Sequence, residues 1–420
     1  MDNWRKVPLG KAFEVQLGKT LSAGSEHGDQ YQYLANRNVQ WGQIVIDDLR
    51  TMHFNLAERE RYRLRAGDLL VCEGGEVGRA ALWSDELPEC YFQNAIHRLR
   101  GTGIIDQGFM RHYIEFAAVA GLLRAMTGRT SIGHLPRSKL VRWLVPVPPL
   151  EEQRRIAKVL DTLNETVEAT KRVIAKRRFI RAGLAADLLN GSSARVTSTN
   201  SKPNGALSSP VSTSTSGTSV MTDWESRSIE ELVALVSSGG TPTAGDPRYY
   251  ADCGTPFLKI DDITRSISRF VDQAELSITD LALEESAARI FPAGTVLVTM
   301  YGTIGVTKTL LSPMATNQAI AALVPPFRCD PDYLAHALSF RRASLERLAA
   351  QTTQPNISGA IIRRFRLPLP PLLEQRRIAE ILDTVDSSIH HNRVELAKLR
   401  RLRTGLASDL FSGRIRTAAT

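Results

Sequence analysis

A chain of 420 residues is too long for one ordinary hydrophobic core, so two or more domains are expected. Hydrophobic residues make up 43% of the chain and charged residues 23%, a composition that is typical of globular proteins and excludes bulk disorder. The formal net charge of +9 favours a polyanionic partner such as nucleic acid, because Lys and Arg side chains that neutralise phosphates release condensed counterions. A moderately basic enzyme is the alternative.

The first residues, MDNWRKVPLG, lack the apolar core of a secretion signal, and no stretch approaches the roughly 18 apolar residues of a membrane span. The cysteines stand too far apart for the usual ligand spacing of a metal site; they are Cys72, Cys90, Cys253 and Cys329. The sequence therefore predicts a cytoplasmic protein without structural zinc.

Residues 1–148 are predicted to form the first globular domain. Short β-rich runs such as residues 68–72 are broken by glycine turns. An amphipathic helix is expected from Phe109 onward, and the polar loop TGRTSIGHL follows it. Strands and helices do not alternate regularly, which favours a mixed α+β fold.

A long helix is predicted over residues 149–191. Pro149 suits its first turn and Gly191 its C-terminal end, and about 40 helical residues would extend roughly 60 Å. Apolar residues at heptad spacing indicate a coiled-coil seam; they are Ile156, Leu160, Leu163, Val167 and Ile174. Thr170 interrupts this seam, either to fix its register or as a tolerated, partly exposed site.

The same helix carries a basic run made up of Lys171, Arg172, Lys176, Arg177, Arg178 and Arg181. One interpretation is that this run faces DNA phosphates. The alternative, which we favour on sequence grounds, is a solvated face that complements the dipole at the C-terminal end of the helix.

Residues 192–222 are rich in Ser, Thr, Gly and Pro, which predicts a flexible linker. After this linker the organisation repeats, with a second globular domain over 223–370, a second long helix over 371–413 and a tail over 414–420. The segment PVPPLEEQRRIAKVLDT at Pro146 returns without a gap as PLPPLLEQRRIAEILDT at Pro368. Such a close internal repeat is the signature of a duplicated architecture.

The second helix repeats the apolar seam, and Asn392 interrupts it where Thr170 interrupts the first. Its apolar positions are Ile378, Leu382, Val385, Ile389, Leu396, Leu399, Leu406 and Leu410. Two such helices in one chain, each after an equivalent domain, are predicted to pack antiparallel with an internal pseudo-two-fold axis.

The globular domains correspond more weakly than the helices do. Trp4 corresponds to Trp224, and GDLLVCEGGEVG at Gly67 corresponds to GTVLVTMYGTIG at Gly294. The helix expected at Phe109 answers another at Tyr333. The second domain is therefore also predicted to be α+β.

Motifs for chemistry are weak. LGKT at residues 17–20 lacks the first glycine of a phosphate-binding loop, because Phe13 stands there. VPPF at residues 324–327 has a valine where amino methyltransferases have Asp or Asn. Acidic pairs at residues 47–48 and 261–262 have no matching Glu-x-Lys, and the histidines show no paired spacing. The sequence therefore predicts a protein without catalytic or metal residues.

The two copies of PPLxEQRRIA, each followed by LDT and GLA-DL, resemble the repeats of Type I restriction-modification specificity subunits. The GTIG turn at residues 302–305, NQAI at Asn317 and TQPNIS at Thr353 also resemble landmarks of the second domain of that family. The first half departs from this pattern, since GGEVG replaces the turn, QNAI at Gln93 inverts the Asn-Gln pair and SIGHLP replaces QPNIS. This departure implies that the two halves read different DNA sequences.

The resemblance implies two target recognition domains, each of which reads one half of a split, asymmetric DNA site while the helices hold them. It also implies two modification subunits, which would bind S-adenosylmethionine and methylate adenine N6. Restriction subunits would add translocation and cleavage with ATP and Mg²⁺. The chain itself would hold no cofactor and would recognise DNA without modifying it.

Base-reading residues are expected in the polar loops, since Arg and Lys can contact guanine while Asn and Gln can contact adenine. Each candidate could equally stabilise its own loop. The candidates are Lys19, Arg37, Asn38, Arg129, Thr130, Ser131 and His134 in the first domain, and Thr241, Lys259, Tyr301, Thr353, Gln354 and Asn356 in the second. The duplicated helix residues Gln153, Arg154, Arg155, Gln375, Arg376 and Arg377 are predicted to dock partners or to join the helices.

Two alternatives stand beside this interpretation. A self-sufficient DNA methyltransferase or nuclease would need a cofactor or metal site, which the motifs do not supply. A coiled-coil scaffold without a nucleic-acid role would leave the positive charge and the polar loops without a use.

Overall fold

The computed structural model describes residues 4–20, 27–124, 126, 134–190, 224–266, 268–349 and 356–417. The chain divides into two compact units. Unit 1 combines Met1–Lys171 with Glu395–Thr420, and unit 2 is Arg172–Val394. Each long helix therefore contributes one half to each unit, which the domain order along the sequence does not suggest.

Unit 1 contains two small sheets and two strand pairs. The sheets have the strand orders β2-β10-β7-β8 and β6-β3-β9, and the pairs are β1-β11 and β4-β5. The elements are β1 (Arg5–Pro8), α1 (Leu9–Ala12), β2 (Phe13–Leu17), β3 (Asp29–Leu34), β4 (Val39–Gln40), β5 (Gln43–Ile44), β6 (Arg50–Phe54), α2 (Leu56–Tyr62), β7 (Leu69–Cys72), β8 (Ala80–Leu82), β9 (Tyr91–Phe92), β10 (Ile96–Gly101), α3 (Gln107–Val119), α4 (Arg137–Arg142) and β11 (Leu144–Val147).

Unit 2 contains two five-stranded sheets, β13-β22-β19-β20-β16 and β14-β17-β15-β21-β18, and the strand pair β12-β23. The elements are β12 (Glu225–Ser228), α6 (Ile229–Leu232), β13 (Leu235–Ser238), β14 (Tyr250–Ala251), β15 (Thr255–Leu258), α7 (Ile260–Arg265), β16 (Phe270–Val271), β17 (Leu276–Ile278), α8 (Asp280–Glu285), β18 (Arg289–Phe291), β19 (Val296–Thr299), β20 (Thr307–Leu310), β21 (Met314–Thr316), β22 (Ile320–Val324), α9 (Pro331–Phe340), α10 (Arg342–Ala349), α11 (Gly359–Arg364) and β23 (Arg366–Leu369). The predicted α+β fold is confirmed in both units.

The central strand of each main sheet is buried on both faces. In β19, Val298 packs in the core cluster beneath helix α9, while Leu297 points into a second cluster shared with the other sheet. Strand β7 repeats this arrangement with Val71 and Leu70. Burial on both faces explains why the sequence of these strands is almost continuously apolar.

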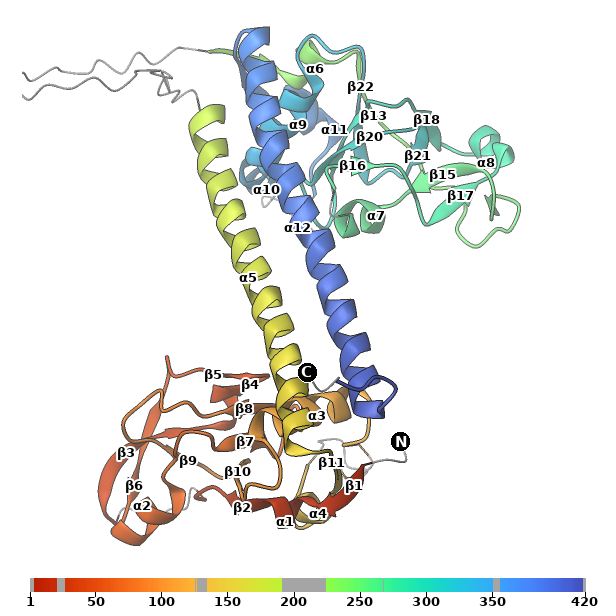
Figure 1. Cartoon of the computed structure of the whole chain (residues 1–420). Coiled ribbons are helices and arrows are strands. Elements are labelled where there is room, and N and C mark those ends of the chain that lie inside the picture. The colour runs from red at the N-terminus through yellow and green to blue at the C-terminus, as the bar shows by residue number, and fades with distance from the viewer. Residues whose placement is uncertain are drawn as a thin grey trace, which may run out of the picture. The chain divides into compact units, whose positions relative to one another are not determined.

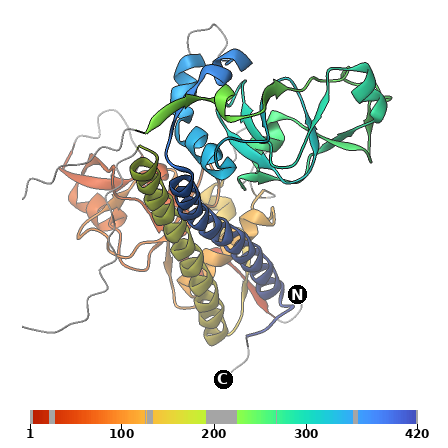
Figure 2. The ribbon, with the colours of Figure 1, turned by 90° about the horizontal axis from the view of Figure 1, so that it is seen from above.

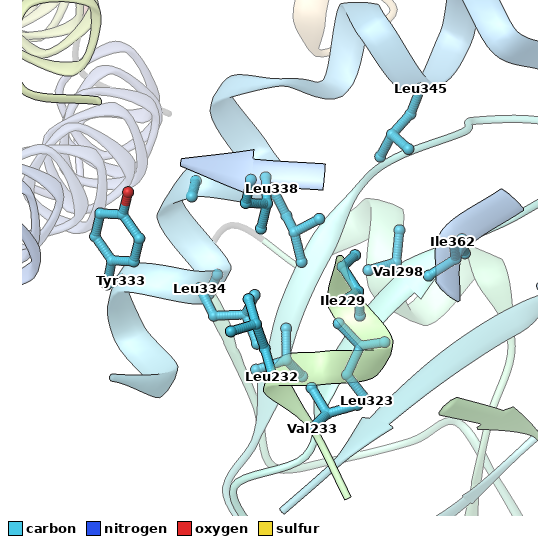
Figure 3. Close-up of a cluster of buried hydrophobic side chains, with 14 of the residues drawn as sticks. Ile229, Leu232, Val233, Val298, Leu323, Tyr333, Leu334, Leu338, Leu345 and Ile362 are labelled. Atoms are coloured by element: carbon cyan, nitrogen blue, oxygen red, sulfur yellow. The ribbon is translucent and has the colours of Figure 1, made fainter. Parts of the chain in front are cut away.

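Figure 3 shows the main core of unit 2. Leu232 of α6, Leu323 of β22 and Leu338 of α9 lie in the same cluster as Val298. Each of these side chains is at most 2% exposed, and the full burial of one such side chain contributes roughly 1.5–3 kcal/mol. This core fixes the strands whose ends carry the polar loops.

The long helices are α5 (Leu150–Leu189) and α12 (Leu372–Ser412), with 40 and 41 residues. Within unit 1, Arg403 of α12 contacts Asn164 and Arg416 beyond its end pairs with Glu152 near the start of α5. Within unit 2, Arg181 of α5 pairs with Asp386 of α12. In each unit the two halves thus run antiparallel, as predicted, and Figures 1 and 2 draw the two helices side by side.

The predicted seam is buried in part, since Leu163, Val385, Leu396, Leu399 and Leu406 are only partly buried. Its residues near the helix starts belong to the cores of the globular parts. Ile156 and Leu160 pack in the core of unit 1 with Phe109, and Ile378 and Leu382 occupy the same place in unit 2. Each helix start is therefore anchored in the globular part that precedes it.

The polar interruptions of the seam bond to their own helix. The Thr170 hydroxyl donates to the carbonyl of Thr166 at 2.8 Å, and the Asn392 amide donates to that of Ser388 at 2.6 Å. These bonds satisfy the two side chains within one helix, so they supply no cross-helix register contact.

A histidine and an aspartate join the globular helix of each unit to its long helix. His112 Nε2 lies 2.9 Å from Asp161 Oδ1 in unit 1, and His336 Nε2 lies 2.9 Å from Asp383 Oδ1 in unit 2. Burial lowers the pKa of His112, which favours its neutral form. This repeated pair explains why an aspartate recurs at the same place in both long helices.

Among the residues that the structure describes, no helix combines the length and apolar character needed to cross a bilayer.

Candidate nucleic-acid interface

In unit 1, polar turns meet at the ends of β2, β7 and β9. We call residues 18–20, 73–78, 93–95 and 134–136 loop cluster 1. The backbone N–H of Glu73 donates to the carbonyl of Ala95 at 2.9 Å, and the N–H of Leu135 donates to the carbonyl of Glu73 at 2.8 Å. The N–H of Asn94 donates to the carbonyl of Lys19 at 2.7 Å. Together these bonds hold the four chain segments, far apart in sequence, in one place.

Unit 2 repeats this arrangement in loop cluster 2, which comprises residues 239–241, 300–305, 317–319 and 356–358. The N–H of Met300 donates to Ala319 at 2.8 Å, and the N–H of Ile357 donates to Met300 at 3.0 Å. A bridge joins Tyr301 to Asn356, at the positions that Gly74 and His134 occupy in unit 1. The same backbone bonds thus present different side chains in the two units.

A glycine lets two backbone segments approach closely in each cluster. A Cβ atom on Gly18 would lie 2.2 Å from the carbonyl oxygen of Gln93, and one on Gly239 would lie 1.8 Å from that of Thr316. Both distances are far below van der Waals contact. The glycine of the weak LGKT motif therefore serves packing in this structure.

Loop cluster 1 contains a buried carboxylate between two histidines. Glu73 Oε1 lies 3.1 Å from Nε2 of His134, which is 60% exposed, and 3.8 Å from Nε2 of the buried His97. Burial lowers the pKa of His97, so its neutral form is favoured. Glu73 therefore holds His134 at the surface, where its ring can contact a ligand.

Two of the predicted DNA contacts are internal. The Lys19 ammonium is buried and bonds to Glu58 Oε2 and to the His53 carbonyl, both at 2.7 Å. Asn38 is also buried, and its amide donates to the Val45 carbonyl at 2.9 Å. Lys19 thus links its turn to β6 and α2, and Asn38 holds its own loop, so the structure places both side chains inside the fold instead of at its surface.

Arg37 remains accessible. Its guanidinium is 43% exposed and pairs with Asp48 at 2.8 Å, and such an exposed pair contributes little stability and can exchange partners. Five further candidates lie outside the described residues; they are Arg129, Thr130, Ser131, Thr353 and Gln354.

Loop cluster 2 brings together three predicted residues, Thr241, Tyr301 and Asn356. The Thr241 hydroxyl donates to Gln318 Oε1 at 2.6 Å, and the Tyr301 ring is 44% exposed. Lys259 lies beside the cluster, because the carbonyl of the preceding residue, Leu258, accepts the N–H of Asn317 at 3.2 Å. Lys259 itself is half-buried. These side chains can donate and accept hydrogen bonds toward a polar partner.

The candidate residues omitted Gln93 and Gln318, which lie within the two clusters. The sequence signal was present, since both belong to the QNAI and NQAI segments on which the family resemblance partly rests. An amide at each of these positions could contact adenine in the major groove.

The acidic pairs that suggested a weak metal site have structural uses. Asp262 Oδ2 accepts the Lys259 N–H at 2.9 Å at the start of α7, and Asp48 pairs with Arg37. In the part of the chain that the structure describes, no group of three His, Cys, Asp or Glu residues is placed to hold a metal ion.

The duplicated glutamines anchor the long helices to the globular parts. Gln153 Oε1 accepts the N–H of Asp106 at 2.8 Å, and Gln375 Oε1 accepts that of Asp330 at 2.8 Å. Each amide also donates to the proline carbonyl five residues earlier, at 2.8 and 2.7 Å. Both side chains are buried, and each joins its long helix to the N-cap residue of α3 or α9, which fits the predicted helix-helix role.

The neighbouring arginines differ from the glutamines. Arg154 is exposed and pairs with Glu151 of its own helix, and Arg376 and Arg377 are exposed as well. Arg155 bonds to Thr417 near the C-terminus at 3.3 Å. The docking prediction thus remains open for Arg154, Arg376 and Arg377.

Replacement of Gln375 by alanine is expected to destabilise unit 2 by about 1–3 kcal/mol, because it leaves the buried N–H of Asp330 without an acceptor. Gln153→Ala should do the same to unit 1. Hydrogen exchange of α9 and α3 peptides would report each loss. Arg376→Ala, one residue away and exposed, is the control and should change stability by less than about 0.5 kcal/mol. Equal effects of both changes would contradict the anchoring role.

The comparison with protein families decides the identity. A family model described as the Type I restriction modification DNA specificity domain matches residues 1–176 and again residues 221–400. The chain belongs to the Type I restriction-modification DNA specificity family. The two matches follow the internal repeat and confirm the predicted class, a DNA specificity protein rather than an enzyme.

Several specificity subunits are similar in sequence to this member of the family. The MjaVIII subunit of Methanocaldococcus jannaschii is 22% identical over 99% of this chain and 93% of its own length. The EcoKI subunit of Escherichia coli K12 is 22% identical over 92% of this chain and 83% of its own. The MjaIX subunit of M. jannaschii is 26% identical, but the match spans 45% of this chain and 44% of that protein.

Solved structures of the same family share the fold. The S subunit of the Type I restriction-modification system from M. genitalium covers 100% of this chain and 97% of its own, with a TM-score of 0.63 and 16% identity. A chain from a structure on complex assembly of the type I system covers 98% of each, with a TM-score of 0.56 and 20% identity.

Proposed function

We propose that this chain is the sequence-specific DNA-binding subunit of a Type I restriction-modification complex, and that it reads a split, asymmetric site. Loop cluster 1 would read one half of the site and loop cluster 2 the other. The observation that supports this most is the repeated backbone scaffold with unlike side chains, Gly74 and His134 in unit 1 against Tyr301 and Asn356 in unit 2. Different donors and acceptors at equivalent places would select different bases.

The partners follow from the family. Two modification subunits would bind S-adenosylmethionine and methylate adenine N6, and restriction subunits would use ATP and Mg²⁺ to translocate and cleave DNA. The equivalent exposed residues Arg154 and Arg376 would offer two copies of one modification subunit similar docking points, as duplicated surfaces require. The complex would act on DNA in the cytoplasm.

The experiment is a selection from a random duplex pool by the full chain, with and without its modification subunit, followed by methyl transfer from labelled S-adenosylmethionine. We expect a motif with two specified halves and an unspecified spacer, and methylation only when the modification subunit is present. Methyl transfer by the chain alone would contradict the non-catalytic role. A pool without enrichment in both samples would favour a scaffold.

A further inference from the structure

Unit 2 contains a basic groove, which includes Arg178 and Arg181 from the basic run of the first long helix. It has a volume of about 690 Å³ and lies where the second half of α5 and the first half of α12 meet β16, β20 and the turn before β20. We call it the basic groove. Its charged lining consists of Arg178, Arg181, Arg269, Lys308, Arg342, His390 and Arg393, with Asp383 and Asp386.

The acidic side chains of the groove are already paired. Asp386 binds Arg181 at 2.9 Å and Asp383 binds Arg269 at 2.7 Å, while Arg342 binds Glu346 at 2.9 Å. Among the described residues, neither Arg178 nor Arg393 has an ion pair. These two guanidinium groups therefore leave an excess of positive charge in the groove.

Lys308 adds a third cation at the floor. Lys308 is 7% exposed, and its ammonium donates to the carbonyls of Ser266, at 2.8 Å, and Ser268. Among the described residues it has no ion pair with a carboxylate. Burial and the nearby Arg393 lower the pKa of Lys308 to about 8, and burial together with Arg178 lowers the pKa of Arg393. Arg393 thus lies close enough to repel both Lys308 and Arg178, while Asp386 partly offsets its charge, and an anion in the groove would relieve the repulsion that is left.

The internal repeat shows that this charge is particular to unit 2. Arg178 and Arg393 correspond to Arg400 and Lys171 in unit 1, and the position of Lys308 is taken by Ala81. The acidic Glu165 and Glu168 of α5 correspond to Ser387 and His390 of α12, and Glu168 pairs with Lys171 at 2.6 Å. At these equivalent positions the positive charges of unit 1 are balanced by glutamates, whereas those of unit 2 are not.

We propose that the basic groove is a backbone contact for DNA, in which Arg178, Lys308 and Arg393 hold a phosphate of the duplex whose bases face loop cluster 2. The groove and that cluster share the turn at Gly305, so a duplex bound at the cluster would have phosphates within reach. Arginine and lysine side chains are the usual phosphate ligands. The proposal rests on the proposed function, and it makes DNA binding by unit 2 less dependent on base contacts than binding by unit 1.

The test compares two double variants of the full chain that remove the same charge from equivalent helix positions. Arg178→Gln with Arg393→Gln removes two positive charges from the groove and is called the groove variant. Lys171→Gln with Arg400→Gln is the matched control in unit 1. Binding to a duplex of random sequence is measured by fluorescence anisotropy over a range of salt concentrations. Loss of this one phosphate contact should reduce the slope of log K against log salt by about 1 and weaken binding at 0.1 M salt by roughly tenfold.

We expect this change only in the groove variant, with the control close to wild type and with the slope retained in Arg178→Lys with Arg393→Lys. Thermal unfolding of each variant checks that the groove variant is folded. Equal losses of DNA affinity in both Gln variants, or an unchanged salt slope in the groove variant, would overturn the proposed phosphate contact. A third outcome would also contradict the proposal: the groove variant loses the binding of pyrophosphate measured by calorimetry, but its salt slope for DNA binding is unchanged. A wild-type chain that does not bind DNA would defeat the proposed function as well.

Discussion

Replacement of Gly239 by alanine is expected to disrupt the junction of the two sheets of unit 2 and to abolish recognition by loop cluster 2. The new Cβ atom would lie 1.8 Å from the Thr316 carbonyl oxygen, so one of two strands must move. Because the clash is with backbone and not with a flexible side chain, the free energy of unfolding of unit 2 should fall by about 3–5 kcal/mol, which is large for a single substitution. Unit 1 should keep its own stability, because the equivalent Gly18 is unchanged.

Hydrogen exchange would measure this loss peptide by peptide in β13, β21 and β22. The control is Gly405→Ala in helix α12, where a Cβ atom meets nothing within 4 Å. Alanine favours a helix over glycine by about 1 kcal/mol, so this variant should be neutral or more stable. A Gly239→Ala protein with wild-type exchange would mean that the close approach at Thr316 does not hold in solution.

The second large effect concerns specificity. Replacement of Asn356 by alanine is expected to relax base selection in one half of the recognised site, at a cost of about 1–3 kcal/mol per lost bidentate contact. Asn356 is half-buried and bridges to Tyr301 through the backbone, so the loss of its amide should leave the loop in place. Quantitative binding to a library with one substituted position at a time would locate the relaxed bases. Uniform weakening at all positions would assign Asn356 a structural role instead.

Much of the fold could be predicted because it is duplicated and periodic. The apolar runs of β7 and β19 predicted buried positions, and those positions are buried, while the heptad residues of the helices are buried or partly buried. The partition into units could not be predicted, since it depends on which half of α5 packs against which half of α12. Contacts between segments so distant in sequence leave no local pattern.

The site was predictable in location more than in detail. Polar loops after buried strands indicated the two clusters, and Thr241, Tyr301 and Asn356 meet in one of them. The burial of Lys19 and Gln153 could not be predicted, because the sequence does not show whether a long polar side chain faces solvent or bonds to a buried carbonyl. Their burial follows from tertiary packing, which residue type and spacing do not encode.

The central claim is that each loop cluster reads its own half of one DNA site. The most direct test selects from a random duplex pool in parallel with three proteins, the wild type, His134→Ala and Asn356→Ala, each with its modification subunit. The account predicts a two-part motif for the wild type, relaxation confined to one half for His134→Ala, and relaxation confined to the other half for Asn356→Ala. Relaxation of the same half by both variants, or of both halves by either one, would contradict it.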